Sequence, residues 1–139
     1  MKIEFDTETI RLINLFENLT QTNIKDCLID RSTNTVYFVV EENEAAMAIG
    51  KNGSKIKIIE KLINRRIKVF EYSKDLKKFV KNLIPSAINI EIQNGEEPIV
   101  IVNVDKIEKS VVIGRDERNL KIYKKLLERN HKVKNLIIR

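Results

Sequence analysis

Two glycines stand three positions apart in the segment "IGKNGSKI" (residues 49–56), which decides how the rest of the chain is interpreted. The chain has 139 residues and only four glycines, so this pair is a concentrated signal. Lysines lie between and after the two glycines, and an isoleucine closes each end. The segment has three interpretations: a connection between two helices, a phosphate loop of a nucleotide site, or a clamp for the backbone of a polymer.

A nucleotide-binding loop fits the segment poorly. A P-loop needs two glycines separated by four residues, the second followed at once by lysine and a hydroxyl residue. Here a lysine falls between the glycines, and Gly53 is followed by Ser54. The dinucleotide-binding pattern GxGxxG does not occur either. We therefore do not expect nucleotide hydrolysis.

The other two interpretations use the glycines differently. A plain helix connection would use Gly50 as a left-handed C-cap, which leaves Gly53 less well explained. A clamp uses both, because a loop without side chains at its ends lets main chain approach a sugar–phosphate strand. The N–H groups at the start of the next helix then suit an anion. The side chains expected to help are Lys51, Lys55 and Lys57 as mobile charges, with Ile49 and Ile58 flooring a groove.

Charge changes sign along the chain at this segment. Residues 1–50 carry four Lys/Arg and nine Asp/Glu, whereas residues 51–72 carry seven and two, and residues 73–139 carry fifteen and nine. The net charge is +6. An anionic partner is therefore expected, with the positive surface beginning at Lys51.

Other residue types exclude several classes of protein. Apolar runs are too short to span a membrane, and "MKIEFDTET" has no signal-peptide core. The one cysteine, Cys27, is expected to be a buried strand residue in a cytoplasmic protein. The one histidine, His131, has no evident nucleophile partner, and no metal-ligand spacing occurs. We expect no enzyme activity, cofactor, metal, membrane contact or small-molecule substrate.

Periodicity predicts the first set of elements. A helix is expected over residues 6–22, capped by Asp6 or Thr7, followed by a hairpin around residues 31–34. A short helix ends at Gly50, a second covers residues 54–64, and a strand covers residues 66–72. The side chains predicted to face inward are Leu12, Leu15, Phe16 and Leu19 in the first helix and Ile56, Ile59, Leu62 and Ile63 in the third.

A further helix is predicted over residues 73–84, with Ser73 as a candidate cap, and Pro85 ends it. The pattern then restarts. An offset of 64 aligns residues 36–69 with residues 100–133 without a gap, and 12 of the 34 pairs are identical. The segment "IGKNGSKI" recurs as "IGRDERNL" (residues 113–120), in which Glu117 replaces the second glycine. The chain therefore contains two copies of one module.

The segment "AIGKNGSKIKIIEKLINRRIKVFEYS" (residues 48–73) resembles a KH core, with the I-G-x-x-G signature, an amphipathic helix and a strand. The extra helix and strand before the signature resemble the prokaryotic, type II variety. The bridge "RRIKVFEYSKDLKKFVKNLIPSAI" (residues 65–88), followed by "VVIGRDERNLKI" (residues 111–122), resembles the tandem KH region of the NusA transcription termination/antitermination family. The likeness covers residues 25–139. Because this chain has no room for the additional domains of bacterial NusA, it resembles the shorter archaeal form.

The resemblance implies an α+β fold of two tandem type II KH domains, each with a three-stranded sheet packed on helices. The first would cover residues 1–72 and the second residues 73–139, with the helix at 74–84 joining them. It also implies a monomer that binds single-stranded RNA, with RNA polymerase as a further partner. The implied RNA-binding residues of the first module are Ile49, Gly50, Lys51, Asn52, Gly53, Ser54, Lys55, Lys57 and Ile58, with Arg65 and Arg66 on the rim.

The second module departs from the family pattern. Asp116 and Glu117 are expected to cap the following helix, and their charges would repel a phosphate. Weaker binding is therefore expected there, through Gly114, Arg115, Arg118 and Lys121. Three roles stay open on the sequence: transcription elongation or termination, ribosome assembly or RNA processing, and a protein–protein adaptor with reduced RNA binding.

Overall fold

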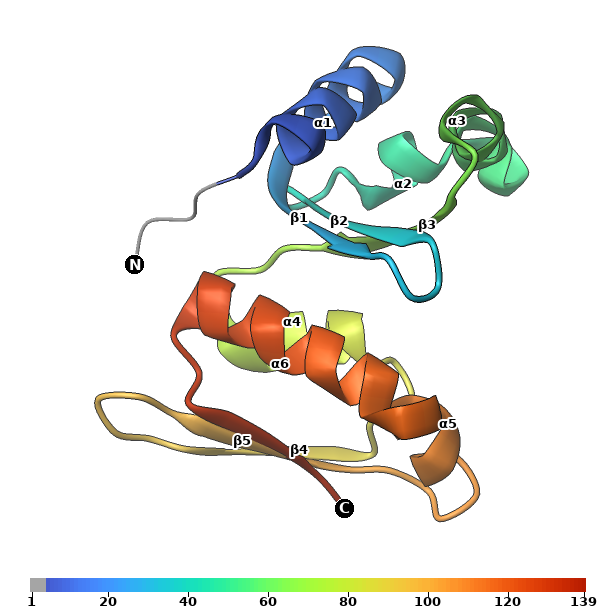
Figure 1. Ribbon diagram of the computed structural model, residues 1–139. Helices are drawn as coiled ribbons and strands as arrows, with labels where there is room; N and C mark the ends of the chain where they lie inside the picture. Colours follow the sequence, from blue (N-terminus) through green and yellow to red (C-terminus); the bar gives the residue numbers. More distant parts are fainter. Residues whose placement is uncertain (1–4) are drawn as a thin grey trace. The chain divides into compact units, whose positions relative to one another are not determined.

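The computed structural model describes residues 5–139, which divide into two compact units at residues 73 and 74. The first four residues, which the sequence assigns to the first module, lie outside the described residues. Both units have an α+β fold in which helices cover one face of a three-stranded sheet (Figure 1). This confirms the predicted fold class at the level of helices on a three-stranded sheet.

The first unit begins with α1 (Thr7–Thr20), which Asp6 caps by accepting the Thr9 N–H at 2.8 Å. Strands β1 (Ile24–Asp30) and β2 (Thr35–Val40) then form the predicted hairpin. The remaining elements are α2 (Ala45–Ile49), the 3-10 turn η1 (Lys51–Gly53), α3 (Ser54–Ile63) and β3 (Arg66–Glu71). Strand β2 is central; it pairs antiparallel with β1 and parallel with β3.

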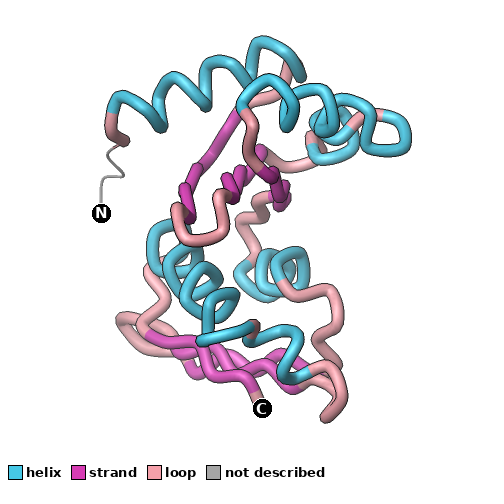
Figure 2. The backbone as a smooth tube through the Cα atoms, turned by 45° about the vertical axis from the view of Figure 1, so that its right-hand side comes forward, coloured by secondary structure: helices cyan, strands magenta, loops and turns pink. Residues whose placement is uncertain are grey.

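The second unit repeats this order (Figure 2). Its elements are α4 (Leu76–Leu83), β4 (Asn89–Gln93), β5 (Ile99–Asn103), α5 (Lys109–Ile113), η2 (Arg115–Glu117), α6 (Arg118–His131) and β6 (Asn135–Ile138). Strand β5 is central, antiparallel to β4 and parallel to β6. The two units therefore share element order, strand order and strand directions.

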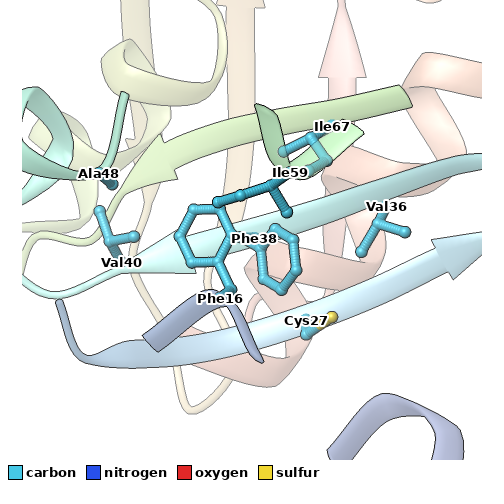
Figure 3. Close-up of a cluster of buried hydrophobic side chains, with 8 residues drawn as sticks. All are labelled: Phe16, Cys27, Val36, Phe38, Val40, Ala48, Ile59 and Ile67. Atoms are coloured by element: carbon cyan, nitrogen blue, oxygen red, sulfur yellow. The ribbon is translucent and has the colours of Figure 1, made fainter. Parts of the chain in front are cut away.

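The core of the first unit forms between α1, α3 and the sheet (Figure 3). The rings of Phe16 and Phe38 stack with their centroids 4.1 Å apart. Cys27, only 2% exposed, packs in the same cluster from β1, as its apolar interpretation predicted. Ala48 brings α2 into the core, so the short helix before the loop is fixed on the sheet side.

Several predicted details are wrong. Leu19 is 44% exposed and Leu62 is 63% exposed, because the apolar stripes of α1 and α3 are wider than the faces that the sheet can cover. The helix predicted to start at Ser73 begins at Leu76, and Asp75 is its cap, accepting the Lys77 N–H at 3.2 Å.

The gapless repeat also fails at its end. Val36 pairs with Ile67 in the first sheet, and its counterpart Val100 pairs with Leu136, so the last strands are offset by 69 residues (136 − 67) rather than 64. Helix α6 has 14 residues against 10 in α3, which accounts for most of this shift. The identical pair Val69 and Val133 is therefore not structurally equivalent.

Candidate nucleic-acid interface

The loop after α2 requires glycine at its first position. Gly50 has φ 77° and ψ 172°, a region that only glycine adopts readily. A Cβ atom there would lie 2.8 Å from Cγ of Lys55 and 3.0 Å from Oγ of Ser54. The predicted left-handed C-cap at Gly50 is therefore wrong in conformation, although the positive φ explains why glycine is needed.

The left-handed residues lie later in the loop. Asn52 has φ 55° and ψ 29°, and Gly53 has φ 72° and ψ 18°. A Cβ atom on Gly53 would meet no heavy atom within 4 Å, so nothing crowds this position. Gly53 lies directly before α3 and keeps the backbone bare where the helix begins. The loop is open to a ligand on this side.

The second loop has the same backbone. Gly114 has φ 79° and ψ 166°, and a Cβ atom there would lie 2.8 Å from Nδ2 of Asn119. Asp116 (φ 56°, ψ 32°) and Glu117 (φ 60°, ψ 22°) adopt the left-handed conformations of their counterparts Asn52 and Gly53. Loss of the second glycine has therefore changed the side chains of this loop and left its backbone path unchanged.

The expectation that Asp116 and Glu117 cap α6 is wrong. Both lie before the first helical residue, Arg118, and the helix start has no side-chain cap hydrogen bond. Both side chains are exposed. Their charges consequently project from the loop, where they oppose an approaching anion.

Both loops are fastened by hydrogen bonds. The Gly53 N–H donates to the Gly50 carbonyl at 3.2 Å, and the Ser54 N–H donates to the Lys51 carbonyl. The Ser54 N–H is thus not free for an anion, contrary to the prediction that α3 starts with free donors. The Lys55 amine donates to the Met47 carbonyl at 2.9 Å, so it acts as a brace. Asn119 donates to the Val111 carbonyl at 3.2 Å in the second loop.

The predicted contact side chains are brought together at the first loop. Lys51, Asn52, Ser54 and Lys57 are exposed, with no pKa shift that would neutralise either lysine. Ile49 is 37% exposed and Ile58 is 59% exposed, so both apolar flanks are accessible. Around the second loop, Arg115 and Lys121 are exposed and Arg118 is partly buried.

Arg65 and Arg66 differ, although they are neighbours. Arg65 is bound by Glu8 from α1, and Glu8 also accepts from Arg31 at 2.7 Å. The hydrogen bonds to Arg31 and Arg65 hold the pKa of the Glu8 carboxyl below its ordinary value. The Nη1 atom of Arg65 is buried and has no acceptor among the described residues. Arg66 is exposed, so of the two predicted rim residues it is the more accessible.

A hollow of about 680 Å³ lies at the end of α3 and was not predicted. It is lined by the hairpin turn, by α3 and by the start of β3. Lys57 and the rim arginines reach it, and sequence reasoning missed the others: Asn34, Lys61, Asn64 and Lys68. The signal was available in part, since Lys57, Lys61 and Arg65 recur every four residues and therefore share one face of the helix.

The described part of the chain has no group of three or more His, Cys, Asp or Glu side chains placed to hold a metal ion. Over the same residues, no helix combines the length and the apolarity needed to cross a membrane.

Comparison with known proteins gives the family. The KH domain model matches residues 11–97. The "Probable transcription termination protein NusA" of Thermoplasma acidophilum is 30% identical over 142 residues, covering 99% of this chain and 96% of that protein. The protein of the same name from Methanococcus vannielii is 33% identical over 126 residues, covering 86% of this chain and 70% of that protein.

A solved structure agrees with both. "Crystal structure of APE1850" superimposes with a TM-score of 0.80 at 31% identity, covering 97% of this chain and all of that one. The family match and the relatives confirm the likeness seen in residues 48–73 and in the bridge that follows. The chain belongs to the KH-domain family and, within it, to the NusA-like proteins.

Proposed function

We propose that this protein is a non-enzymatic factor that binds single-stranded RNA and acts in transcription elongation, termination or antitermination. KH modules clamp the backbone of short unpaired RNA at the GxxG loop, and this chain has the loop in its first unit. The printed names of the relatives refer to transcription termination, which supports the same role here. Nascent RNA is the proposed ligand, and RNA polymerase is the proposed protein partner of a monomer in the cytoplasm.

Two tandem type II KH domains are the proposed architecture. Each unit has a helix and a hairpin before the loop-bearing helix pair, and its last strand lies parallel to the central one. This order supports the prokaryotic variety. The proposed boundary between the domains lies at residues 72–73, with the helix at 74–84 as the connection.

The observation that carries the proposal is the exposed chemistry of the first loop. Its bare backbone at Gly50 and Gly53 is flanked by the exposed Lys51 and Asn52 on one side. The accessible Ile49 and Ile58 provide apolar surface for unstacked bases. The proposed contact set is that predicted from the sequence, with Lys55 serving mainly to hold the loop closed.

The second loop is proposed as a weaker site. Its backbone matches the first, and Gly114, Arg115, Arg118 and Lys121 remain available as contacts. The exposed Asp116 and Glu117 place two negative charges where a phosphate would approach. At an effective dielectric constant of about 20, a unit charge 4 Å away is worth roughly 4 kcal/mol, so these acids oppose binding strongly.

A charge reversal in the first loop tests the proposal. The variant Lys51→Asp/Asn52→Asp should lose measurable binding to a fluorescein-labelled single-stranded RNA, followed by anisotropy at 0.1 M salt. The matched control, Arg115→Asp in the second loop, makes the same local reversal and should cause a much smaller loss. Circular dichroism verifies the fold. Unchanged affinity of the first variant would exclude the clamp.

The transcription role needs a separate measurement. Sequencing RNA crosslinked to the protein in cells should recover nascent transcripts of many genes. Recovery of ribosomal RNA precursors instead would favour ribosome assembly or RNA processing. If no RNA is recovered, the chain is a protein–protein adaptor, an outcome to which the acidic second loop already lends some support.

A further inference from the structure

The hollow at the end of α3 carries an unusual concentration of positive charge. Five cations and one carboxylate line it, at the junction of the hairpin turn, the helix and β3. They are Lys57, Lys61, Arg65, Arg66 and Lys68, with Glu60 as the acid. All belong to the first unit, and only Lys57 is also part of the proposed loop site.

Most of these charges are not neutralised within the protein. Glu60 accepts the Ile67 N–H at 2.9 Å, and Arg65 is bound by Glu8. Among the described residues, Lys57, Lys61, Arg66 and Lys68 have no carboxylate at ion-pair distance. All four are exposed. The hollow therefore presents four unpaired cations to solvent.

Helix stability does not explain the cluster. Cations near the carboxyl end of a helix interact well with its dipole, which accounts for Lys61 and Arg65. Lys57 lies in the first half of α3, and Arg66 and Lys68 lie in β3, where this effect does not act. Like charges four residues apart on a helix, such as Lys57 and Lys61, are destabilising. A ligand that offsets this repulsion is the simplest reason for the arrangement.

The second unit shows that the fold does not require these charges. A hollow of about 390 Å³ lies at the corresponding junction. The correspondence is fixed by one hydrogen bond: the Arg66 N–H donates to Asn34 in the first unit, and the Lys134 N–H donates to Pro98 in the second. The charged residues there are Glu97, Glu128, Lys132 and Lys134, which balance. Positive charge is thus particular to the first hollow.

We propose that the first hollow binds phosphate groups of the RNA strand that continues beyond the loop. The inference rests on the proposed RNA-binding function and extends the site along α3. Ten residues at 1.5 Å each make α3 about 15 Å long, so a strand leaving the loop needs only a few nucleotides to reach the hollow. Lys57 and Lys61 line the route on one helix face, and Arg66 and Lys68 receive the strand at its end.

A length-dependent binding experiment tests the proposal. The variant Lys61→Gln/Arg66→Gln/Lys68→Gln removes three charges from the hollow and leaves the loop intact. It is compared with Lys125→Gln/Lys132→Gln/Lys134→Gln, which removes three charges around the second hollow. Each protein is titrated with single-stranded RNAs of about 4 and about 12 nucleotides, because a KH loop clamps about four nucleotides. Salt is varied from 0.05 to 0.3 M, values chosen so that counterion release dominates the slope.

On the longer RNA the first variant should lower the salt slope by about 2, since each single-strand phosphate contact contributes roughly 0.7. Its affinity at 0.1 M salt should fall between about 10-fold and 100-fold on the same basis. Binding of the short RNA should change little. The second variant should leave the slope for the longer RNA close to that of the unaltered protein.

Two results would overturn the inference. An unchanged slope on the longer RNA would mean that the hollow contacts no RNA phosphate. Equal losses from both triple variants would mean that overall charge, and not the hollow, produces the effect. The loop variant Lys51→Asp/Asn52→Asp separates the two proposals. If that variant binds normally while the hollow variant does not, the clamp is wrong and the hollow is the RNA site.

Discussion

The loops at residues 50–53 and 114–117 follow the same backbone path but differ in chemistry. Both begin with a glycine that no other residue could replace without a clash, and both contain two left-handed residues. The first offers lysine, asparagine and glycine, whereas the second offers arginine, aspartate and glutamate. The comparison teaches that glycine in such a signature has two separable roles. Gly50 and Gly114 are needed to form the turn, and Gly53 is needed to leave it uncovered.

The largest expected effect tests the first of these roles. Replacing Gly50 by alanine should lower the free energy of unfolding by about 2–4 kcal/mol, since it combines a strained backbone with a clash against α3. Gly53→Ala, where space is open, should cost only about 1 kcal/mol for its left-handed conformation. Urea denaturation of both variants measures the difference. Equal losses would show that the two glycines are not distinct in role.

The second expected effect concerns the acids of the other loop. The variant Asp116→Asn/Glu117→Gly gives that loop the neutral residues of the first without altering the backbone. RNA affinity should rise about 5- to 10-fold, because two negative charges no longer face the phosphates. Anisotropy titration against the unaltered chain measures the gain. If affinity stays constant, the second unit does not contact RNA through this loop and has a structural or protein-facing role.

The smallest expected effect involves Glu8, which links α1 to Arg31 and Arg65. Because its pKa is lowered in the folded protein, the stabilisation is present above the ordinary value of about 4.5 and is lost as the pH falls through the folded-state pKa. Glu8→Gln should therefore lower thermal stability slightly at pH 7 and make no difference at low pH. Melting curves at pH 7 and pH 3 compare the two proteins. A difference that persists at pH 3 would assign the effect to packing.

The same pair of modules shows how far sequence reasoning reaches. The order of helices and strands, the hairpin and the position of both loops follow from local patterns, and an offset of 64 residues relates the two copies from Val36 through the first turns of α3 and α6. Burial does not follow. Leu62 and Leu126 are identical and equivalent in sequence, yet the first is 63% exposed and the second is fully buried in a longer helix that packs against α4.

Contacts between distant residues were equally out of reach. The ion pair of Glu8 and Arg65 joins residues 57 positions apart, and neither has a distinctive local pattern. Lys55 looks like a mobile charge in the sequence, but its amine closes the loop on the Met47 carbonyl. The cationic hollow could be foreseen only where its members share α3. Arg66 and Lys68 join it through the parallel pairing of β3 with β2, which no local pattern specifies.

The central claim is that side chains, on a shared backbone, make the first loop an RNA clamp and the second a poor one. The most direct test is the variant Asn52→Asp/Gly53→Glu, which places the acids of the second loop on the first. Asp116 and Glu117 already occupy the same conformations, so the fold should persist. RNA affinity by anisotropy should fall at least 30-fold, or roughly 2 kcal/mol, as two repulsive charges enter the site. An unchanged affinity in a folded variant would contradict the claim.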